Sequence, residues 1–166
     1  MRDKIRILSL GFGLVLIDQF LKYLIMSNFN LFDSQKIIPH FFSLTYVRNT
    51  GAAFSVLEGK ISFFVLLSIG ILLYFGYYLV QTKNIPSVKQ VVYSLLFGGI
   101  VGNLIDRLRF GAVIDYLDVQ FGTYQFAIFN FADCCIVIGG MLLLLLAWKE
   151  EIYEIHHRKR GHNKTN

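Results

Sequence analysis

The chain has 166 residues, of which 55% are hydrophobic and only 16% are Asp, Glu, Lys or Arg. These proportions exclude an ordinary soluble domain and a disordered chain. The net charge of +5 does not indicate a nucleic-acid partner, because the basic residues lie at the ends of apolar runs and not in a stripe mixed with aromatic residues. The sequence predicts an integral membrane protein, with residues 1–166 forming a single domain that no linker or repeat divides.

The first apolar segment covers about residues 5–26, close to the roughly 20 residues that a helix needs to cross the hydrocarbon. Basic residues precede it, as in a secretory signal. No small-residue cleavage site follows, and three more apolar segments do, so we expect this helix to be retained. Asp18 and Lys22 are four residues apart and share one helical face, which suits either an ion pair that fixes the helix or direct chemistry.

Residues 28–59 are more polar and predict an ordered platform outside the membrane. From residue 42 to residue 47, Phe42, Leu44 and Tyr46 alternate with Ser43, Thr45 and Val47. This period of two is typical of a strand. The residues Arg48-Asn49-Thr50-Gly51 then have the composition of a turn. Taken without the rest of the chain, this segment would indicate only an ordinary surface hairpin.

The second and third apolar segments differ in polarity. The second, about residues 61–80, has no charged residue and is expected to serve as a packing wall. The third, about residues 88–108, carries Asn103 and Arg107 four residues apart on one face. Small residues on this helix would allow close contact with another helix: Gly98, Gly99 and Gly102.

The fourth apolar segment, about residues 126–148, contains a single charge, Asp133, near its start. The adjacent Cys134 and Cys135 offer no disulfide framework and no metal-ligand spacing, and we expect them to be packing groups. The tail, residues 149–166, is rich in Glu, His and basic residues. We expect it to be a solvated, partly helical end in the cytoplasm and not a metal site.

Most Lys and Arg residues fall in the N-terminal end, the loop after the second segment, and the tail. The positive-inside rule therefore predicts that both termini are cytoplasmic. The predicted fold is a membrane all-α fold with a small β element: four transmembrane helices plus an extracytoplasmic β platform. In this topology most of the polar residues converge at the outer membrane surface, namely Asp18, Asn49, Asn103, Asp106, Asp115 and Asp133.

Acidic residues at membrane depth are functional candidates because placing a carboxylate near hydrocarbon is unfavourable. Asp115 is expected in the loop after the third helix and Asp133 at the start of the fourth, so a hairpin could bring them face to face. Two such carboxylates share a proton, one acting as base and one as acid, which suits amide hydrolysis. The plainer alternative is an ion pair between Asp106 and Arg107 with the other two acids solvated. A cysteine nucleophile would need a base, and nothing in the sequence ties His40 to that role.

Five blocks of the chain resemble the lipoprotein signal peptidases, also called signal peptidase II. These are bacterial aspartyl peptidases that remove signal peptides from lipid-modified prolipoproteins. The blocks are Asp18-Gln-Phe-Leu-Lys22, Arg48-Asn49-Thr-Gly51-Ala52-Ala53, Gly99 with Asn103-Leu-Ile-Asp106-Arg107, Val113-Ile-Asp115-Tyr116, and Phe129-Asn130-Phe-Ala132-Asp133. Each block is weak evidence alone, but five in this order over nearly the whole chain are specific.

The resemblance implies that Asp115 and Asp133 are the catalytic pair and that the enzyme uses no metal or organic cofactor. It also implies a set of residues that shape the site and hold the substrate: Asp18, Lys22, Asn49, Gly51, Asn103, Asp106, Arg107 and Asn130. Two departures from the family pattern stand beside catalytic positions. Tyr116 occupies a position where Phe is common, and Cys134 and Cys135 follow the second aspartate.

The substrates that the resemblance implies are diacylglyceryl-modified prolipoproteins, cut on the amino side of the lipid-modified cysteine. We further expect contact with membrane phospholipids, no nucleic acid, and a monomer in the bacterial cytoplasmic (inner) membrane with its site at the outer leaflet. Two other classes remain open. A proton- or ion-coupled transporter would have polar residues through the whole bilayer depth. A structural protein would use its polar residues only to join helices.

Overall fold

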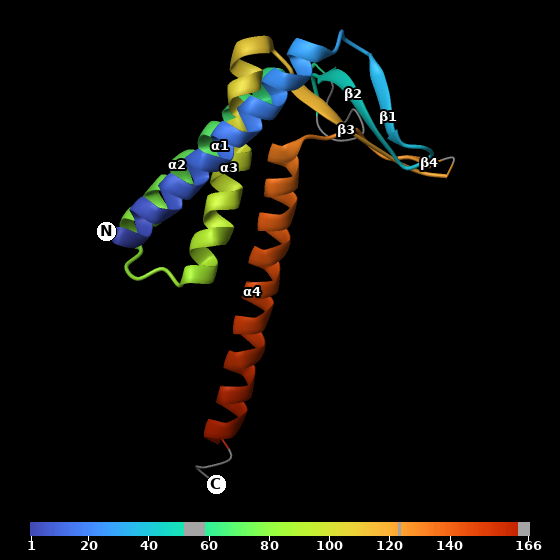
Figure 1. Ribbon diagram of the computed structural model, residues 1–166. Coiled ribbons are helices and arrows are strands. Elements are labelled where there is room, and N and C mark those ends of the chain that lie inside the picture. The colour runs from blue at the N-terminus through green and yellow to red at the C-terminus, as the bar shows by residue number, and fades with distance from the viewer. Residues whose placement is uncertain (52–58, 123, 163–166) are drawn as a thin grey trace.

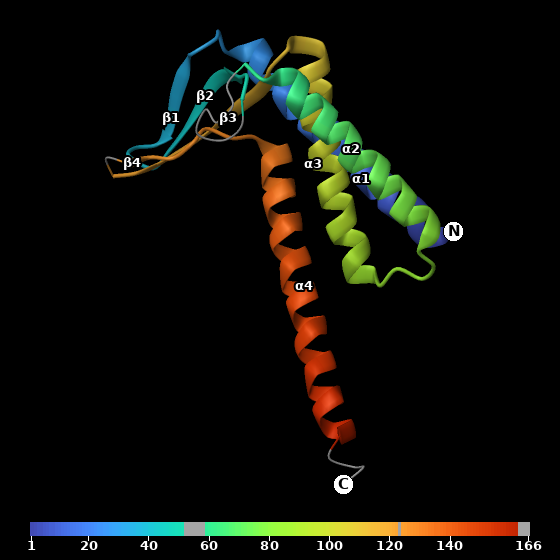
Figure 2. The same ribbon diagram turned by 180° about the vertical axis from the view of Figure 1, so that it is seen from behind.

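A computed structural model describes residues 1–51, 59–122 and 124–162. In this part of the chain the helices are α1 (Arg2–Asn28), α2 (Ile61–Gln81), α3 (Ser87–Phe110) and α4 (Phe131–His162), and the strands are β1 (Ser34–Ile38), β2 (Phe42–Asn49), β3 (Val113–Phe121) and β4 (Tyr124–Gln125). The sheet lies at one end of the helices, and both chain termini lie toward the other end (Figure 1). Helix α3 lies between α2 and α4 in Figure 1 and also in the view from behind (Figure 2).

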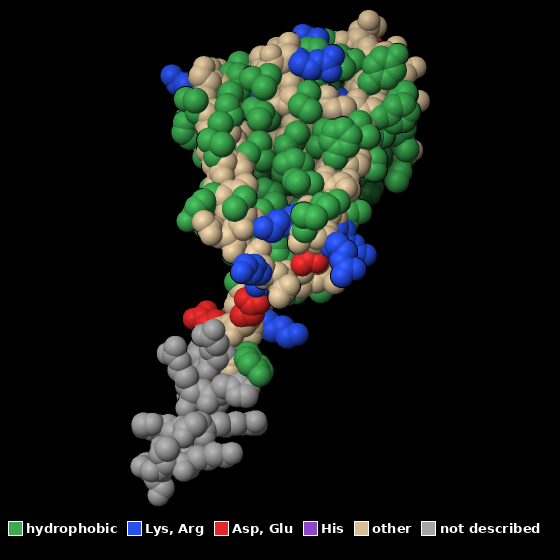
Figure 3. All heavy atoms as spheres, turned by 90° about the vertical axis from the view of Figure 1, so that its left-hand side faces the viewer, with side chains coloured by type: hydrophobic (Ala, Val, Ile, Leu, Met, Phe, Trp, Pro, Cys, Tyr) green, Lys and Arg blue, Asp and Glu red, His purple; other side chains and the backbone are tan. Residues whose placement is uncertain are grey.

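The helices are long and apolar enough to cross a membrane: Arg2–Asn28, Ile61–Gln81, Ser87–Phe110 and Phe131–Tyr153. Many of their large apolar side chains point outward instead of into the protein, as a lipid environment allows. In Figure 3 these side chains form a broad apolar band with Lys and Arg toward its two ends. The predicted fold, four membrane helices with a small β element, is confirmed.

The start of α4 corrects the predicted boundary of the fourth span. The helix begins at Phe131 and not at residue 126. The residues before it run along β3, where the Phe129 N–H donates to the Leu117 carbonyl at 3.1 Å and the Leu117 N–H donates back at 2.7 Å. Backbone groups used in this ladder are not free for a helix. At its other end α4 continues past residue 148 to His162, and the remaining spans differ from prediction by a few residues at their ends.

Helix α3 is the central helix and packs against α1, α2 and α4. Its glycines make this possible because neighbouring helices approach its backbone closely. A Cβ atom on Gly98 would lie 2.7 Å from the Leu14 Cβ of α1, and one on Gly99 would lie 2.5 Å from the Ala132 carbonyl oxygen of α4. The glycine face predicted for this helix therefore holds α1 on one side and α4 on the other.

The end of the bundle away from the sheet has an apolar core. Ile7 and Val92 are fully buried, and Leu79 of α2 packs against them. The Ser94 hydroxyl joins α3 to α1 by donating to the Ile7 carbonyl at 3.1 Å. Close packing of large apolar side chains explains why these helices stay together at this end.

The sheet is antiparallel, in the order β1-β2-β3-β4. The strand predicted around residues 42–47 is confirmed as β2. Its long-range partner β3 pairs Val47 with Asp115 and Asn49 with Val113. The predicted loop position of Asp115 was therefore wrong. The side chains of Tyr46 and Ile114 join a buried cluster under the sheet, and this cluster fixes β3 against the ends of the helices. Ala52 and Ala53, which end the second block of the resemblance, lie outside the described residues.

Candidate active site

Asp133 is built into the first turn of α4. The Asn130 side-chain oxygen accepts the Asp133 N–H at 2.9 Å, and the Asp133 Oδ2 accepts the Asn130 N–H at 3.2 Å. This reciprocal pair is a capping box, which satisfies two backbone donors that the helix itself leaves free. The position of the Asp133 carboxylate is thus fixed by the start of its own helix.

The next two N–H groups of α4 are bound by side chains from elsewhere in the chain. The Phe131 N–H donates to the Tyr116 hydroxyl oxygen at 3.3 Å, and the Ala132 N–H donates to Asp18 Oδ1 at 3.0 Å. The Tyr116 hydroxyl, a departure from the family pattern, therefore has a structural partner. Burial raises the pKa of Tyr116, so the hydroxyl stays protonated at neutral pH. Side chains from α1 and β3 together hold the beginning of α4.

Asp115 and Asp133 are joined through one residue, Asn130. Besides capping α4, the Asn130 Nδ2 donates to Asp115 Oδ1 at 2.6 Å. The second oxygen of Asp115 accepts from Asn49 Nδ2 at 2.9 Å, and Asp133 Oδ1 accepts from Asn103 Nδ2 at 2.7 Å. All four carboxylate oxygens therefore accept hydrogen bonds from neutral amides. We call Asp115 and Asp133 the dyad.

The surroundings of Asp115 favour a protonated carboxyl. Its side chain is 1% exposed, and this burial is the main cause that raises its pKa, followed by the negative charge of Asp133. The hydrogen bonds from Asn49 and Asn130 act in the opposite direction. The result is a pKa of about 7, compared with 3.8 for an ordinary aspartate. The dyad can thus hold a proton near neutral pH, the state that acid and base catalysis by two carboxylates requires.

A buried lysine lies behind the dyad. The Lys22 Nζ is 2.9 Å from Asp18 Oδ2 and 2.7 Å from Asp106 Oδ2, and it donates to Asn103 Oδ1 at 3.0 Å. Its side chain is only 1% exposed. An unpaired ammonium at this depth would be strongly unfavourable, but here each of its three N–H groups has an acceptor. We call Lys22, Asp18, Asp106 and Asn103 the Lys22 cluster.

Each acceptor of Lys22 also contacts an element that carries the dyad. Asp18 binds the N-terminus of α4, and Asn103 binds the Asp133 carboxylate. Asp106 Oδ2 accepts the Ile114 N–H at 3.1 Å, directly before Asp115 on β3. The alternative of an ion pair between Asp106 and Arg107 is therefore wrong, because Asp106 pairs with Lys22. The Lys22 cluster fixes β3 and α4 relative to each other.

Gln19, which was not among the predicted site residues, is a further member of this network. Its Nε2 donates to Asp106 Oδ1 at 2.9 Å and also lies 3.2 Å from both the Gly102 carbonyl oxygen and Asp18 Oδ2. The signal was present, since Gln19 stands between Asp18 and Lys22 in an otherwise apolar segment. Its amide joins α1 to α3 beside the ion pairs.

Arg107 and Gly51 lie at the rim of the site. The Gly51 N–H donates to Asn49 Oδ1 at 2.9 Å, which makes the predicted turn after β2. Arg107 Nη2 is 3.4 Å from the Gly51 carbonyl oxygen, and its guanidinium lies over the Phe64 ring, 4.9 Å from the centroid. Arg107 thus connects the turn to α2.

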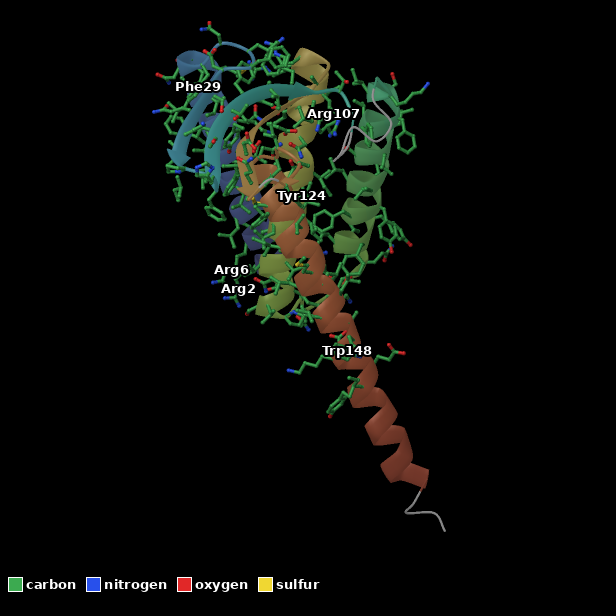
Figure 4. All side chains as sticks on the ribbon, turned by 90° about the vertical axis from the view of Figure 1, so that its right-hand side faces the viewer. Arg2, Arg6, Phe29, Arg107, Tyr124 and Trp148 are labelled. Carbon is green, nitrogen blue, oxygen red and sulfur yellow. The ribbon has the colours of Figure 1, made fainter. Side chains whose placement is uncertain are left out.

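A pocket of about 450 Å³ opens beside the dyad. We call it the dyad pocket. Asp115 and Asp133 both line it, together with Asn49, Gly51 and Arg107, and the rest of its wall is mainly apolar. Cys134 is partly exposed at this wall, whereas Cys135 is buried. Figure 4 shows Arg107 and Tyr124 toward the sheet end of the molecule, and Arg2 and Arg6 farther from the sheet, with Trp148 and the rest of α4 extending beyond them. The pocket therefore lies at the end away from the N-terminus.

All ten residues that the sequence analysis singled out belong to this region. Asp115 and Asp133 line one pocket, Asn49 and Asn130 bind them directly, and Asn103 reaches Asp133. Asp18, Lys22 and Asp106 form the ion pairs behind it, and Gly51 and Arg107 form the rim. Two carboxylates, a shared bridging amide and an apolar pocket can support hydrolysis of a peptide bond.

Comparisons with known proteins show the family of this chain. The family model for signal peptidase (SPase) II matches residues 10–149. Proteins named lipoprotein signal peptidase from Staphylococcus aureus strains JH9 and Newman are 40% identical over 136 residues, covering 82% of this chain and 83% of theirs. Two solved structures of a bacterial membrane enzyme have TM-scores of 0.80 and 0.76. They are 37% and 38% identical and cover 87% and 85% of this chain, and 88% and 91% of their own. The chain belongs to the signal peptidase II family, and is thus a multi-pass membrane protein of a family of proteases.

Proposed function

We propose that this protein is an aspartyl endopeptidase that removes the signal peptide from diacylglyceryl-modified prolipoproteins. The cut falls on the amino side of the lipid-modified cysteine. The observation that carries the proposal is the pairing of Asp115 and Asp133 on one apolar pocket, joined through Asn130. Family membership supports the same reaction.

In the proposed reaction, the ionised carboxylate of the dyad takes a proton from water as the water oxygen attacks the scissile carbonyl carbon. The protonated carboxyl polarises the carbonyl oxygen. It then provides the proton that the leaving amine nitrogen needs when the C–N bond breaks. The pKa of about 7 at Asp115 supports a dyad with one proton at neutral pH. The mechanism uses no metal and no organic cofactor.

The supporting residues have two proposed roles. Asn49, Asn103 and Asn130 orient the carboxylates by donating to their oxygens, and Lys22 fixes the elements behind them. At the rim, Gly51 and Arg107 line the dyad pocket, where they can contact the substrate backbone. Preorganised polar groups of this kind reduce the reorganisation that the reaction would otherwise require.

The proposed location follows from the charge distribution and the lipid on the substrate. Both termini are in the cytoplasm of a bacterial cell, and the dyad lies at the outer leaflet of the cytoplasmic membrane. A diacylglyceryl-modified substrate is already anchored in that leaflet. The protein acts there as a monomer among phospholipids, and the apolar wall of the dyad pocket suits the lipid-bearing end of the peptide.

The test is cleavage of a lipidated prolipoprotein peptide by wild type, Asp115→Asn and Asp133→Asn, with thermal unfolding recorded on the same detergent-solubilised samples. Asp118→Asn, on the same strand as Asp115, is the matched control. Its carboxylate accepts from the Thr45 hydroxyl, and the Asn oxygen can keep this bond. We expect turnover to fall by at least about 10³-fold in both dyad variants with folding intact, and the control to keep its turnover.

Each other outcome has a distinct meaning. Normal turnover in either dyad variant removes that residue from catalysis. If a dyad variant gives less folded protein but its turnover per folded molecule is unchanged, the residue has a structural role. An inactive wild type contradicts the peptidase proposal and leads to ion transport measurements in vesicles.

A further inference from the structure

A second cavity lies between the membrane helices on the side of α3 that faces α2 and α4. Its volume is about 500 Å³, and we call it the tyrosine cavity. Ile71 and Leu72 of α2, Ile100 of α3 and Leu143 of α4 are among its lining residues. Helix α3 lies between α2 and α4 in both ribbon views (Figures 1 and 2). The cavity therefore has α3 as its base and the other two helices as its walls.

The tyrosine cavity adjoins the dyad pocket, since Ile136 lines both. Ile136 stands one helical turn beyond Asp133 on α4. Its backbone N–H also lies close to Gly99, where a Cβ atom would be 3.2 Å away. The apolar surface that begins beside the dyad thus continues along α3 toward the end of the bundle that is away from the sheet.

Aromatic side chains line the far end of the tyrosine cavity. Tyr78 of α2 and Tyr93 of α3 share a hydrogen bond of 3.0 Å between their hydroxyl oxygens, and their rings pack edge to face at 5.6 Å. The ring of Phe75 packs against the ring of Tyr93, with 5.9 Å between the two ring centroids. The two hydroxyls are already hydrogen-bonded to each other and their rings are packed. We therefore call this pair of tyrosines the floor of the cavity.

The distance from the dyad to the far end of the tyrosine cavity matches the thickness of one leaflet. Asn103 and Asp133 are hydrogen-bonded and so mark the same depth on α3 and α4. Tyr93 precedes Asn103 by ten residues, and Leu143 follows Asp133 by ten residues. At about 1.5 Å per residue, both lie about 15 Å from the dyad level. This is about half of the roughly 30 Å hydrocarbon thickness of a bilayer.

The lining of the tyrosine cavity favours an acyl chain. Its lining residues are all aliphatic or aromatic, and none of them is charged. A saturated hydrocarbon chain has no polar group that needs a partner, so it can contact such walls along its whole length.

From this position beside the dyad pocket, this length and this apolar lining we infer that the tyrosine cavity binds one acyl chain of the diacylglyceryl group, and that Tyr78 and Tyr93 set the chain length the enzyme prefers. The inference rests on the proposed function, because the lipid enters with the substrate. A chain about as long as one leaflet fills the groove from the dyad to the tyrosines. A shorter chain leaves apolar wall uncovered, and burial of apolar surface is lost with each missing methylene.

The test compares Ile71→Trp with Leu73→Trp, using one lipopeptide sequence that carries either two hexadecanoyl or two octanoyl chains. Ile71 lines the cavity, and Leu73 is an exposed residue on the same helix that is not part of its lining. We expect Ile71→Trp to raise KM for the hexadecanoyl substrate at least about tenfold with little change for the octanoyl one. Leu73→Trp should leave both unchanged. Tyr78→Ala, which removes half of the floor, should move the preference toward longer chains.

The outcomes separate this inference from the proposed function. A wild type that cleaves both substrates equally well overturns the inference and leaves the peptidase function intact, whereas a wild type that cleaves neither contradicts the function itself. If Ile71→Trp impairs both substrates to the same degree, the cavity holds the signal-peptide helix and the acyl-chain inference is wrong. Thermal unfolding of each variant shows that the comparison is made on folded protein.

Discussion

Helices α1 and α3 pack together along their length, yet the two ends of this contact are built differently. Away from the sheet, Ile7 and Val92 pack tightly and the Ser94 hydroxyl binds a backbone carbonyl. Near the sheet, the same two helices meet through Lys22, Asp106 and their partners. Apolar packing is non-directional, whereas charged hydrogen bonds fix both distance and direction. The apolar end therefore stabilises the bundle, and the polar end positions the dyad.

The largest expected difference between the two ends comes from Lys22→Met and Ile7→Ala. Lys22→Met leaves Asp18 and Asp106 buried without their cation, so we expect about 3–5 kcal/mol of destabilisation and loss of turnover in the protein that remains folded. Ile7→Ala creates a cavity and should destabilise by about 2–5 kcal/mol with turnover per folded molecule unchanged. Thermal unfolding and lipopeptide cleavage measure both effects. Equal turnover in the two variants would contradict the division between the ends.

The pH dependence of stability should also distinguish the two ends. Folded Asp115 keeps its proton up to a pKa of about 7, whereas an unfolded aspartate loses it near pH 4. Between these values the folded state binds more protons, so the free energy of unfolding falls as pH rises, by about 4 kcal/mol in total. Asp115→Asn should flatten this slope, and Ile7→Ala should keep it. Thermal unfolding from pH 4 to pH 8 is the measurement, and an unchanged slope in Asp115→Asn would assign it to other groups.

The rate of peptide cleavage should depend on the same proton of the dyad. Above about pH 7 the dyad loses the proton that its acid member needs, so we expect kcat to fall on the alkaline side, with an apparent pKa that belongs to the pair. Initial rates over a pH series on wild type and Ile7→Ala should give overlapping profiles. A profile that shifts in Ile7→Ala would show that the apolar end influences the dyad.

A smaller effect is expected from methyl groups added to the glycine face of α3. A Cβ atom on Gly102 would lie 2.5 Å from Asp18 Oδ2, and one on Gly98 would lie 2.7 Å from the Leu14 Cβ. Each substitution by Ala should destabilise by about 1–3 kcal/mol. Because Asp18 holds the start of α4, Gly102→Ala should also reduce turnover, while Gly98→Ala should not. Stability and cleavage assays on both variants test this, and matching losses of activity would argue against a positioning role for Asp18.

The smallest expected effect concerns the Tyr116 hydroxyl. Tyr116→Phe removes the acceptor of the Phe131 N–H at the start of α4 and should cost about 1 kcal/mol with a severalfold loss of turnover. Tyr46→Phe is the matched control, because Tyr46 lies in the same cluster but its hydroxyl binds Arg48. We expect this control to keep full turnover. Comparable losses in both variants would mean that the cluster acts only through its packing.

Several features could be predicted from the sequence because they depend on nearby residues. The apolar segments gave the membrane helices, and the alternation around residues 42–47 gave β2. The start of α4 was also encoded locally, since Asn130-Phe-Ala-Asp133 is a helix-capping pattern. This pattern would have placed the start of the fourth helix after Asn130 instead of at residue 126. Strand β3 was missed, because a segment between two apolar helices is typical of a loop until its partner β2 is known.

The sequence by itself determined that this is a four-helix membrane protein with a β platform and which polar residues stand at membrane depth, because helix length and face depend on local spacing. Only the tertiary structure decided how those residues pair. Lys22 with Asp106, Asn103 with Asp133, and Asp18 with Ala132 are bonds between different elements. Their geometry depends on how closely the glycines of α3 let its neighbours approach, and that distance is a property of the packed helices.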